Sequence, residues 1–243
     1  MKLYKELAEW WPLLSPHTDY EEEAALYLEL IRRFHPDVKT AVEFGSGGGS
    51  NAFYLKRHFA MTLTDLSPDM LKVSAALNPD CEHIQGDMKS LDVGSQFDLV
   101  FIHDAIMYFT KPADLLAVMR NAKKHLNEGG ILMIMTDQFK ETFRPVTDHG
   151  GVDSGGRGMR YLEWTYDSDP DDNVTETEYA YIMRDESGEV FREYDRAQSG
   201  LFSMPDWEGM LKEAGFQAHF ERVEYEEVEG AYFAIVATQI LGN

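Results

Sequence analysis

Short, mostly apolar runs recur along the first part of the chain, and segments with helical spacing separate them. The runs do not alternate regularly between apolar and polar positions, as strands with one exposed face would. Apolar strands that alternate with helices are typical of a parallel sheet that is covered on both faces. The pattern therefore predicts an α/β fold with strands near residues 40–44, 61–64, 81–85, 97–102 and 131–135.

A different pattern follows Asp137. Polar and apolar side chains alternate from about residue 157, and residues 163–195 include 12 acidic and two basic side chains. Alternation indicates antiparallel strands with one exposed face, and the sequence DESG at 185–188 suits a hairpin turn. The glycines between residues 150 and 156 predict a mobile approach to these strands. We therefore expect an antiparallel β insertion over residues 151–199.

The chain after this insertion returns to the earlier style. A helix is predicted near residues 205–214, and two strands are predicted near 216–225 and 231–238. The insertion would serve as a substrate lid or as a dimer arm. We divide the chain into an N-terminal helical cover over 1–36, a core over 37–150 and 200–243, and the insertion over 151–199.

The charge balance excludes several classes of partner. The chain has 22 basic and 43 acidic residues, so its net charge is −21 and its isoelectric point is near 4.6. Phosphate backbones and anionic membrane surfaces repel such a chain, so we expect no nucleic-acid or membrane partner. A cytoplasmic protein is the default, because no secretory core and no apolar run of ~20 residues occurs. Cys81 is the only cysteine and the eight histidines lack metal-ligand spacing, so we expect no metal.

A glycine-rich turn after the first predicted strand is the central chemical signal. The strand ends at Glu43-Phe44, and the sequence GSGGG at 45–49 leads into a helix. Glycines let the backbone turn sharply and let a ligand approach the main chain closely. Asp65 lies 22 residues after Glu43 at the end of the second strand, and Asp87 lies 22 residues further. Carboxylates at such strand ends can accept hydrogen bonds from ribose hydroxyls and from an adenine amino group.

Together these motifs resemble the class I S-adenosylmethionine-dependent methyltransferases. The resemblance extends over residues 42–135. It implies a doubly wound, Rossmann-like sheet of seven strands, mostly parallel with the last strand reversed, and it implies S-adenosyl-L-methionine as cofactor. The pieces that carry it are EFGSGGG at 43–49, LTDLSPDML at 63–71, GDM at 86–88, FDLV at 97–100 and LNEGG at 126–130.

The resemblance also implies roles for individual residues. Glu43 would lie near the methionine amino group, Asp65 on the ribose, and Asp87 on the adenine amino group. Leu66 would lie against the adenine, and Gly45 and Gly47 under the methionine and ribose. The other predicted cofactor contacts are Tyr20, Ser46, Met70, Met88 and His103.

The acceptor side carries weaker signals. The sequence DYEEEA at 19–24 and the acidic insertion are similar to small-molecule N-methyltransferases, including those that dimethylate amino sugars. The predicted function is therefore methyl transfer from S-adenosyl-L-methionine to a small-molecule acceptor at nitrogen. An amine must react in its neutral form, and the candidate bases are Tyr108, His103 and Glu163.

Structural interpretations compete with these roles. Asp65 could only cap a helix, Asp104 could be a cap or a substrate ligand, and Tyr108 could be a packing residue. Three aromatic residues could form a lid over the sulfonium or be simply buried: Trp10, Trp11 and Tyr20. A nicotinamide-dependent oxidoreductase and a non-catalytic cofactor-binding domain are the alternative functions. The sequence leaves both a monomer and a homodimer open.

Overall fold

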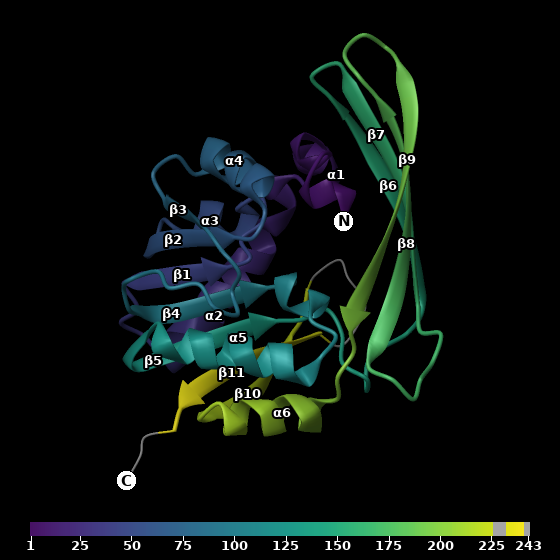
Figure 1. Cartoon of the computed structure of the whole chain (residues 1–243). Helices are drawn as coiled ribbons and strands as arrows, with labels where there is room; N and C mark the ends of the chain where they lie inside the picture. The colour runs from purple at the N-terminus through teal and green to yellow at the C-terminus, as the bar shows by residue number, and fades with distance from the viewer. Residues whose placement is uncertain (226–231, 241–243) are drawn as a thin grey trace.

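The computed structural model describes residues 1–225 and 232–240. Two sheets organise these residues, and Figure 1 shows the smaller one standing beside the larger. The predicted start of the last strand at Ala231 lies outside the described residues.

The larger sheet has seven strands in the order β10-β11-β5-β4-β1-β2-β3. Strand β11 runs antiparallel to both of its neighbours, and the pairs among β1 to β5 are parallel. This confirms the predicted mostly parallel sheet with a reversed last strand. The strands are β1 (Thr40–Phe44), β2 (Ala60–Asp65), β3 (Glu82–Gln85), β4 (Phe97–His103), β5 (Leu126–Met135), β10 (Phe216–Val223) and β11 (Tyr232–Gln239).

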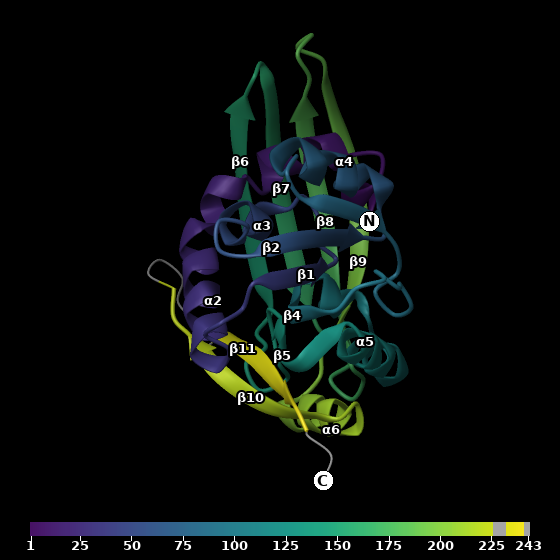
Figure 2. The same ribbon diagram turned by 90° about the vertical axis from the view of Figure 1, so that its left-hand side faces the viewer.

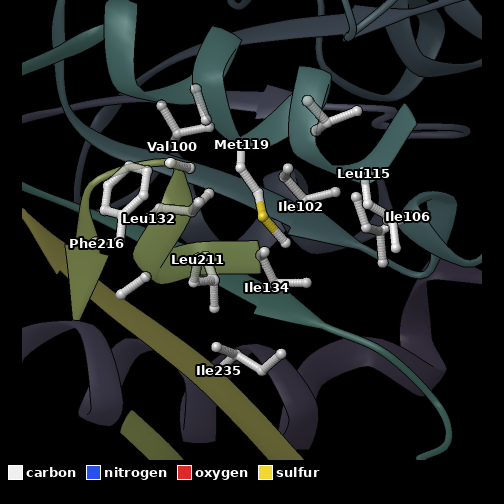
Figure 3. Packing of buried hydrophobic residues seen from close by; sticks show 14 of the residues in the cluster. Val100, Ile102, Ile106, Leu115, Met119, Leu132, Ile134, Leu211, Phe216 and Ile235 are labelled. Carbon is white, nitrogen blue, oxygen red and sulfur yellow. The ribbon is translucent and has the colours of Figure 1, made fainter. Parts of the chain in front are cut away.

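Helices cover both faces of this sheet (Figures 1 and 2). Alternate side chains of β4 and β5 point to opposite faces, so Val100 packs in one apolar cluster and Phe101 in the other. Figure 3 shows the first cluster, in which Leu115 and Met119 meet Ile134 and Leu211. The helices are α2 (Glu21–Phe34), α3 (Ser50–Leu55), α4 (Pro68–Leu77), α5 (Pro112–Lys124) and α6 (Met204–Glu213), and a short 3-10 turn, η4 (Ala105–Tyr108), follows β4.

The smaller sheet is the predicted antiparallel insertion, but it begins earlier than expected. Its strands, in spatial order, are β6 (Val146–Ser154), β7 (Arg157–Tyr166), β8 (Val174–Arg184) and β9 (Val190–Gly200). Residues 146–150 therefore belong to the sheet and not to the core. The predicted glycine-rich approach belongs to this sheet, because Gly150 and Gly151 pair with β7 and Gly155-Gly156 make the hairpin turn. Its mobility stays a prediction. The predicted turn at 185–188 is confirmed, with Gly188 N–H donating to Asp185 O.

The N-terminal segment lies between the two sheets. Leu3, Leu7 and Trp10 pack against Met159 and Met183 of the insertion. This segment consists of η1 (Lys2–Tyr4), η2 (Ala8–Trp10), α1 (Trp11–Leu14) and η3 (His17–Tyr20).

Polar contacts fasten this segment on both sides. On the insertion side, the Lys2 ammonium donates to Glu193 at 2.6 Å and the Lys2 main chain donates to Asp195. On the core side, the Ser67 hydroxyl donates to the carbonyl of Tyr4. The segment therefore joins the two sheets into one body.

Candidate active site

A cleft of about 730 Å³ runs along the carboxyl ends of the core strands. This edge is where open α/β sheets bind ligands. Two predicted residues lie elsewhere: Met70 is buried beneath Gly47, and Glu163 belongs to the insertion. The predicted residues that do line the cleft are Tyr20, Glu43, Gly45, Ser46, Gly47, Asp65, Leu66, Asp87, Met88, His103 and Tyr108.

The glycine turn leaves no room for side chains at Gly45, Gly48 and Gly49. Gly45 has a φ of +72°, and a Cβ there would lie 2.8 Å from Met88 Cε and closer still to Ala105 Cβ. A Cβ on Gly48 would lie 2.6 Å from Trp11 Cδ1. The main chain of the turn therefore borders the cleft directly. A nucleoside ligand in the cleft can then approach the backbone closely.

Asp65 holds the turn in place. One carboxylate oxygen accepts the Gly47 N–H at 2.9 Å, and the other accepts the Ser67 N–H at 2.8 Å. Burial raises the pKa of Asp65, and these backbone donors oppose that shift. Asp65 does not cap the helix itself, because Ser67 is the N-cap of α4 and accepts the Met70 N–H. Its anchoring role is compatible with a ligand role because each oxygen retains a further acceptor position.

Glu43 carries an unpaired buried oxygen. Its side chain is 2% exposed, and Oε2 has no hydrogen-bond partner in the described structure. Burial raises the pKa of Glu43 to about 8, although the nearby His103 opposes the shift. A buried carboxylate is costly until a cation reaches it. The ammonium group of a bound S-adenosylmethionine fits this requirement.

The adenine end of the cleft offers an apolar and an acidic group. Leu66 is 67% exposed and lines the cleft, so a flat ring could cover it. Asp87 follows β3 and accepts the Lys89 N–H at 2.9 Å, and the Lys89 ammonium lies 3.8 Å from it. These groups fit an adenosine moiety without any rearrangement of the strands.

His103 is held between two carboxylates. Its Nε2 lies 2.8 Å from Glu23 and its Nδ1 lies 3.2 Å from Asp104. Burial opposes its charged form, but Asp104 and Glu23 outweigh this and raise the pKa of His103 to about 10. The imidazole is therefore a cation at neutral pH and a poor base. In the sequence Glu23 is noted only as part of DYEEEA at 19–24, because nothing in the pattern places it beside His103.

Tyr108 is linked to the N-terminal segment. Its hydroxyl lies 2.6 Å from the hydroxyl of Tyr4, and the two rings meet edge to face. Desolvation and the neighbouring Tyr4 raise the pKa of Tyr108 well above its usual value, so the phenol keeps its proton. It can orient a ligand but is a poor base. Sequence reasoning missed Tyr4, whose place in the cleft depends on the packing of the whole segment.

The expected aromatic lid is only partly present. Trp11 and Tyr20 line the cleft. Trp10 is buried instead beside Phe191, with the Arg157 guanidinium 3.7 Å from its ring centroid. Trp10 therefore anchors the N-terminal segment to the insertion rather than covering the cleft.

Glu163 faces the core from the insertion. It stands between Asp148 and Tyr179 across the strands. Burial, together with the charges of Asp137 and Asp148, raises the pKa of Glu163 to about 7. It can exchange a proton near neutrality, but it does not line the cofactor cleft.

A second, smaller cavity adjoins the cleft. It measures about 250 Å³ and shares His103 and Asp104 with the cleft. Its wall is mainly acidic, and the residues that form it are Asp19, Glu22, Glu23, Tyr27, His103, Asp104, Met135, Thr136, Asp137, Tyr225 and Tyr232. Asp137 was missed as a site residue, although its place just after a predicted buried strand was the available signal.

Comparison with known proteins agrees with this geometry. A model of a methyltransferase domain matches residues 41–130. A dTDP-3-amino-3,6-dideoxy-alpha-D-glucopyranose N,N-dimethyltransferase of Streptomyces fradiae is 25% identical over 220 residues, which cover 88% of this chain and 85% of the relative. A dTDP-3-amino-3,4,6-trideoxy-alpha-D-glucopyranose N,N-dimethyltransferase of Streptomyces venezuelae is 26% identical, with 86% of each chain covered.

Solved structures share the fold. Streptomyces venezuelae DesVI has a TM-score of 0.81 at 22% identity, with 91% of this chain and 92% of that chain covered. The S-adenosylmethionine-bound amino pentose methyltransferase CalS10 has a TM-score of 0.76 at 22% identity, with 90% and 91% covered. The nicotinamide oxidoreductase alternative finds no support in these matches. The sheet order and the glycine turn with its strand-end carboxylates agree with the matched domain, and together they make this chain similar to the S-adenosylmethionine-dependent methyltransferases.

Proposed function

We propose that the enzyme methylates the nitrogen of a small-molecule amine of the amino-sugar class. The observation that carries this proposal is the acidic cavity beside the cofactor cleft. It opens next to the place where the methyl group would lie, and its carboxylates suit a cationic amine. The relatives named above support it, since each of them methylates the amino group of a nucleotide-linked sugar.

The cofactor half of the site would be held by groups that the core positions. Glu43 would pair with the ammonium of S-adenosyl-L-methionine, and Asp65 would accept hydrogen bonds from its ribose. Leu66 and Asp87 would contact its adenine. When bound, the cofactor supplies a methyl group on an activated sulfonium, so the protein needs mainly to orient the acceptor and exclude water.

The acceptor half would be closed by the insertion and the N-terminal segment. Tyr4, which contacts Tyr108, lines the cofactor cleft, and Tyr179 on the insertion lies close enough to influence the charge state of Tyr108. We propose that the insertion closes over the acceptor side from outside, because the acidic cavity itself is lined by residues of the core and of the N-terminal segment. The alternative role of the insertion as a dimer arm stays a prediction. So do the monomeric or dimeric state and the cytoplasmic location of the protein. Among the described residues, no helix is long and apolar enough to cross a membrane.

A matched pair of acceptors tests the proposed function. The enzyme is incubated with S-adenosyl-L-methionine and a dTDP-linked 3-amino-3,6-dideoxyhexose, or with the same compound carrying a 3-hydroxyl group. We expect N-methylated product, detected by mass spectrometry, from the amine alone. Equal methylation of the hydroxyl compound, or no methylation of any amine in a panel of free and nucleotide-linked amino sugars, contradicts the proposal. A Gly45→Val variant serves as the control without a functional cofactor cradle.

A further inference from the structure

We propose that Asp104 and Asp137 form a proton-accepting pair, which binds the acceptor as an ammonium ion and removes the proton that its nitrogen must lose before methyl transfer. This inference rests on the proposed function and names the group that prepares the acceptor for reaction. Neither residue was among the bases predicted from sequence.

The position of the pair comes from two adjacent parallel strands. Asp104 directly follows β4 and Asp137 lies two residues after β5, and His103 and Met135 are opposite each other in the register of these strands. The Asp104 N–H donates to Met135 O at 3.1 Å, which fixes Asp104 beside the end of β5. The two carboxyl groups therefore follow the adjacent ends of two paired core strands.

This point is the junction between the two cavities. Asp104 lines both the cofactor cleft and the acidic cavity, and Asp137 lines the acidic cavity. On the cleft side, the unpaired and buried oxygen of Glu43 indicates that a cationic ligand group completes the cleft. The acidic cavity lies beside the space for that ligand. This position, more than the charge of the cavity, suits the cavity to hold an acceptor nitrogen.

The two carboxyl groups lie close enough for each to influence the ionisation of the other. Two neighbouring carboxylates disfavour the doubly ionised state, so the pair holds one proton and a single negative charge in this proposal. Partial desolvation raises the pKa of Asp137 well above its usual value, and the neighbouring Asp104 adds to that shift. Partial desolvation also raises the pKa of Asp104, although His103 opposes this.

Charged and titratable groups face the pair from every neighbouring element. His103 on β4 is a cation, and Glu23 on α2 neutralises much of its charge. The charge of Asp137 contributes to the raised pKa of Glu163 on β7. The charges of Asp104 and Asp137 contribute to the raised pKa of Tyr225 after β10. Of the three bases predicted from sequence, His103 is already protonated, Tyr108 retains its proton, and Glu163 lies outside both cavities. The pair borders the acidic cavity, and its member Asp104 also lines the cofactor cleft.

The proposed reaction is a proton transfer from the acceptor to the pair, followed by methyl transfer to the acceptor nitrogen. The acceptor binds as R–NH₃⁺ against the ionised carboxyl of the pair, and one N–H bond breaks as its proton moves to that carboxyl oxygen. The freed electron pair on nitrogen forms the new N–C bond while the methyl–sulfur bond breaks and its electrons remain on sulfur. The products are R–NH₂CH₃⁺, S-adenosylhomocysteine and a doubly protonated pair, which returns its proton to water through the cavity. Each unit by which burial raises the pKa of a carboxyl lowers the cost of the proton transfer by about 1.4 kcal/mol.

Kinetics over a range of pH test the pair. The variant is Asp137→Asn, and the matched control is Asp148→Asn, which removes a carboxylate from the core-facing side of the insertion. The acceptor is the dTDP-linked 3-amino-3,6-dideoxyhexose. We expect kcat/KM of Asp137→Asn to be lowest at acidic pH and to recover about tenfold per pH unit, because only the neutral fraction of the amine then reacts. In the wild type and in Asp148→Asn, kcat/KM should reach its plateau at a lower pH than in Asp137→Asn. A deficit in Asp137→Asn that does not change with pH, or an equal deficit in the control, overturns the proposal.

A second measurement needs no acceptor. Aspartate labelled with ¹³C at the carboxyl carbon reports each titration by NMR. We expect one carboxyl that remains protonated above the range of an ordinary aspartate, and the loss of that signal in both Asp104→Asn and Asp137→Asn. The Kd of Asp137→Asn for S-adenosylhomocysteine should stay within about threefold of the wild type, which shows that the variant is folded. If every amine fails to react but the shared proton is present, the proposed function fails and the pair stands. If all aspartates titrate normally, the pair fails whatever the acceptor.

Discussion

The two sheets are built by different means and offer different chemistry. Core strands such as β1 and β4 are buried on both faces, and the core contributes main-chain turns and carboxylates at strand ends. The insertion packs on one face only, and its other face leaves Leu162, Trp164 and Ile182 about half exposed. The insertion contributes side chains such as Glu163 and Tyr179. The difference teaches that the core shapes the cofactor cleft through its backbone, whereas the insertion acts on its surroundings through its side chains.

The most severe test of this contrast compares two glycines. Gly45 and Gly155 both have positive φ, but a Cβ at Gly45 collides with Ala105 while nothing lies within 4 Å of one at Gly155. We expect Gly45→Val to weaken S-adenosylhomocysteine binding by at least about a hundredfold, since overpacking and strain act together. Gly155→Val should leave the affinity close to that of the wild type. Isothermal calorimetry checks both, and comparable losses would show that backbone geometry is not special to the core.

Two carboxylates give the next comparison. Asp65 and Asp185 each accept backbone N–H groups in a tight turn, one in the core and one in the insertion. We expect Asp65→Ala to cost about 1.5–3 kcal/mol of cofactor binding, or roughly tenfold to a hundredfold in Kd. Asp185→Ala should change the hairpin locally and leave the Kd unchanged. An unaltered Kd for folded Asp65→Ala would remove Asp65 from the cofactor site.

The buried carboxylate of Glu43 predicts a pH dependence confined to the core. Its pKa is raised to about 8 in the free protein, and pairing with a ligand ammonium requires the ionised form. Below that pKa, binding must release a proton, so affinity for S-adenosylhomocysteine should rise by up to about tenfold per unit as the pH increases from 6 to 8. Calorimetry in buffers of different ionisation heat measures the released proton. In Glu43→Gln the dependence should disappear, and a pH-dependent Gln variant would assign the effect to another group.

The smallest expected effect lies at the joint between the two halves. Tyr4→Phe removes the hydrogen bond to Tyr108 but keeps the edge-to-face ring contact. We expect a loss of about 1 kcal/mol in the free energy of unfolding, with a few-fold weaker cofactor binding. Tyr194→Phe, on the exposed face of the insertion, is the matched control and should change neither. Urea titration and calorimetry compare them, and a larger effect in Tyr194→Phe would place the joint elsewhere.

The sequence predicted the core well because its signals are local. Continuous apolar runs mark strands that are buried on both faces, and glycines must follow β1 where φ is positive and space is lacking. The equal spacing of Glu43, Asp65 and Asp87 reflects the repeated strand–helix unit. These features depend on the chain near each residue, so a single sequence reveals them.

The acceptor side could not be predicted in the same way. Glu23 and His103 are 80 residues apart, and only the packing of α2 on the sheet brings them to 2.8 Å. The choice between a lid and a buried role for Trp10 stayed open because aromatic composition does not reveal which ring Arg157 will contact. The start of the insertion was placed late because Gly150 and Gly151, which usually interrupt strands, pair within β6. Long-range contacts decide all three cases.

The insertion leaves the core and rejoins it at neighbouring points. The Lys140 N–H donates to Phe202 O at 3.1 Å, so the chain before β6 and the chain after β9 run side by side. A segment bounded in this way can be exchanged by recombination without rethreading the strands that bind the methyl donor. Exchange of this segment would change the part of the protein that closes over the proposed acceptor side and leave the strands that line the cofactor cleft in place.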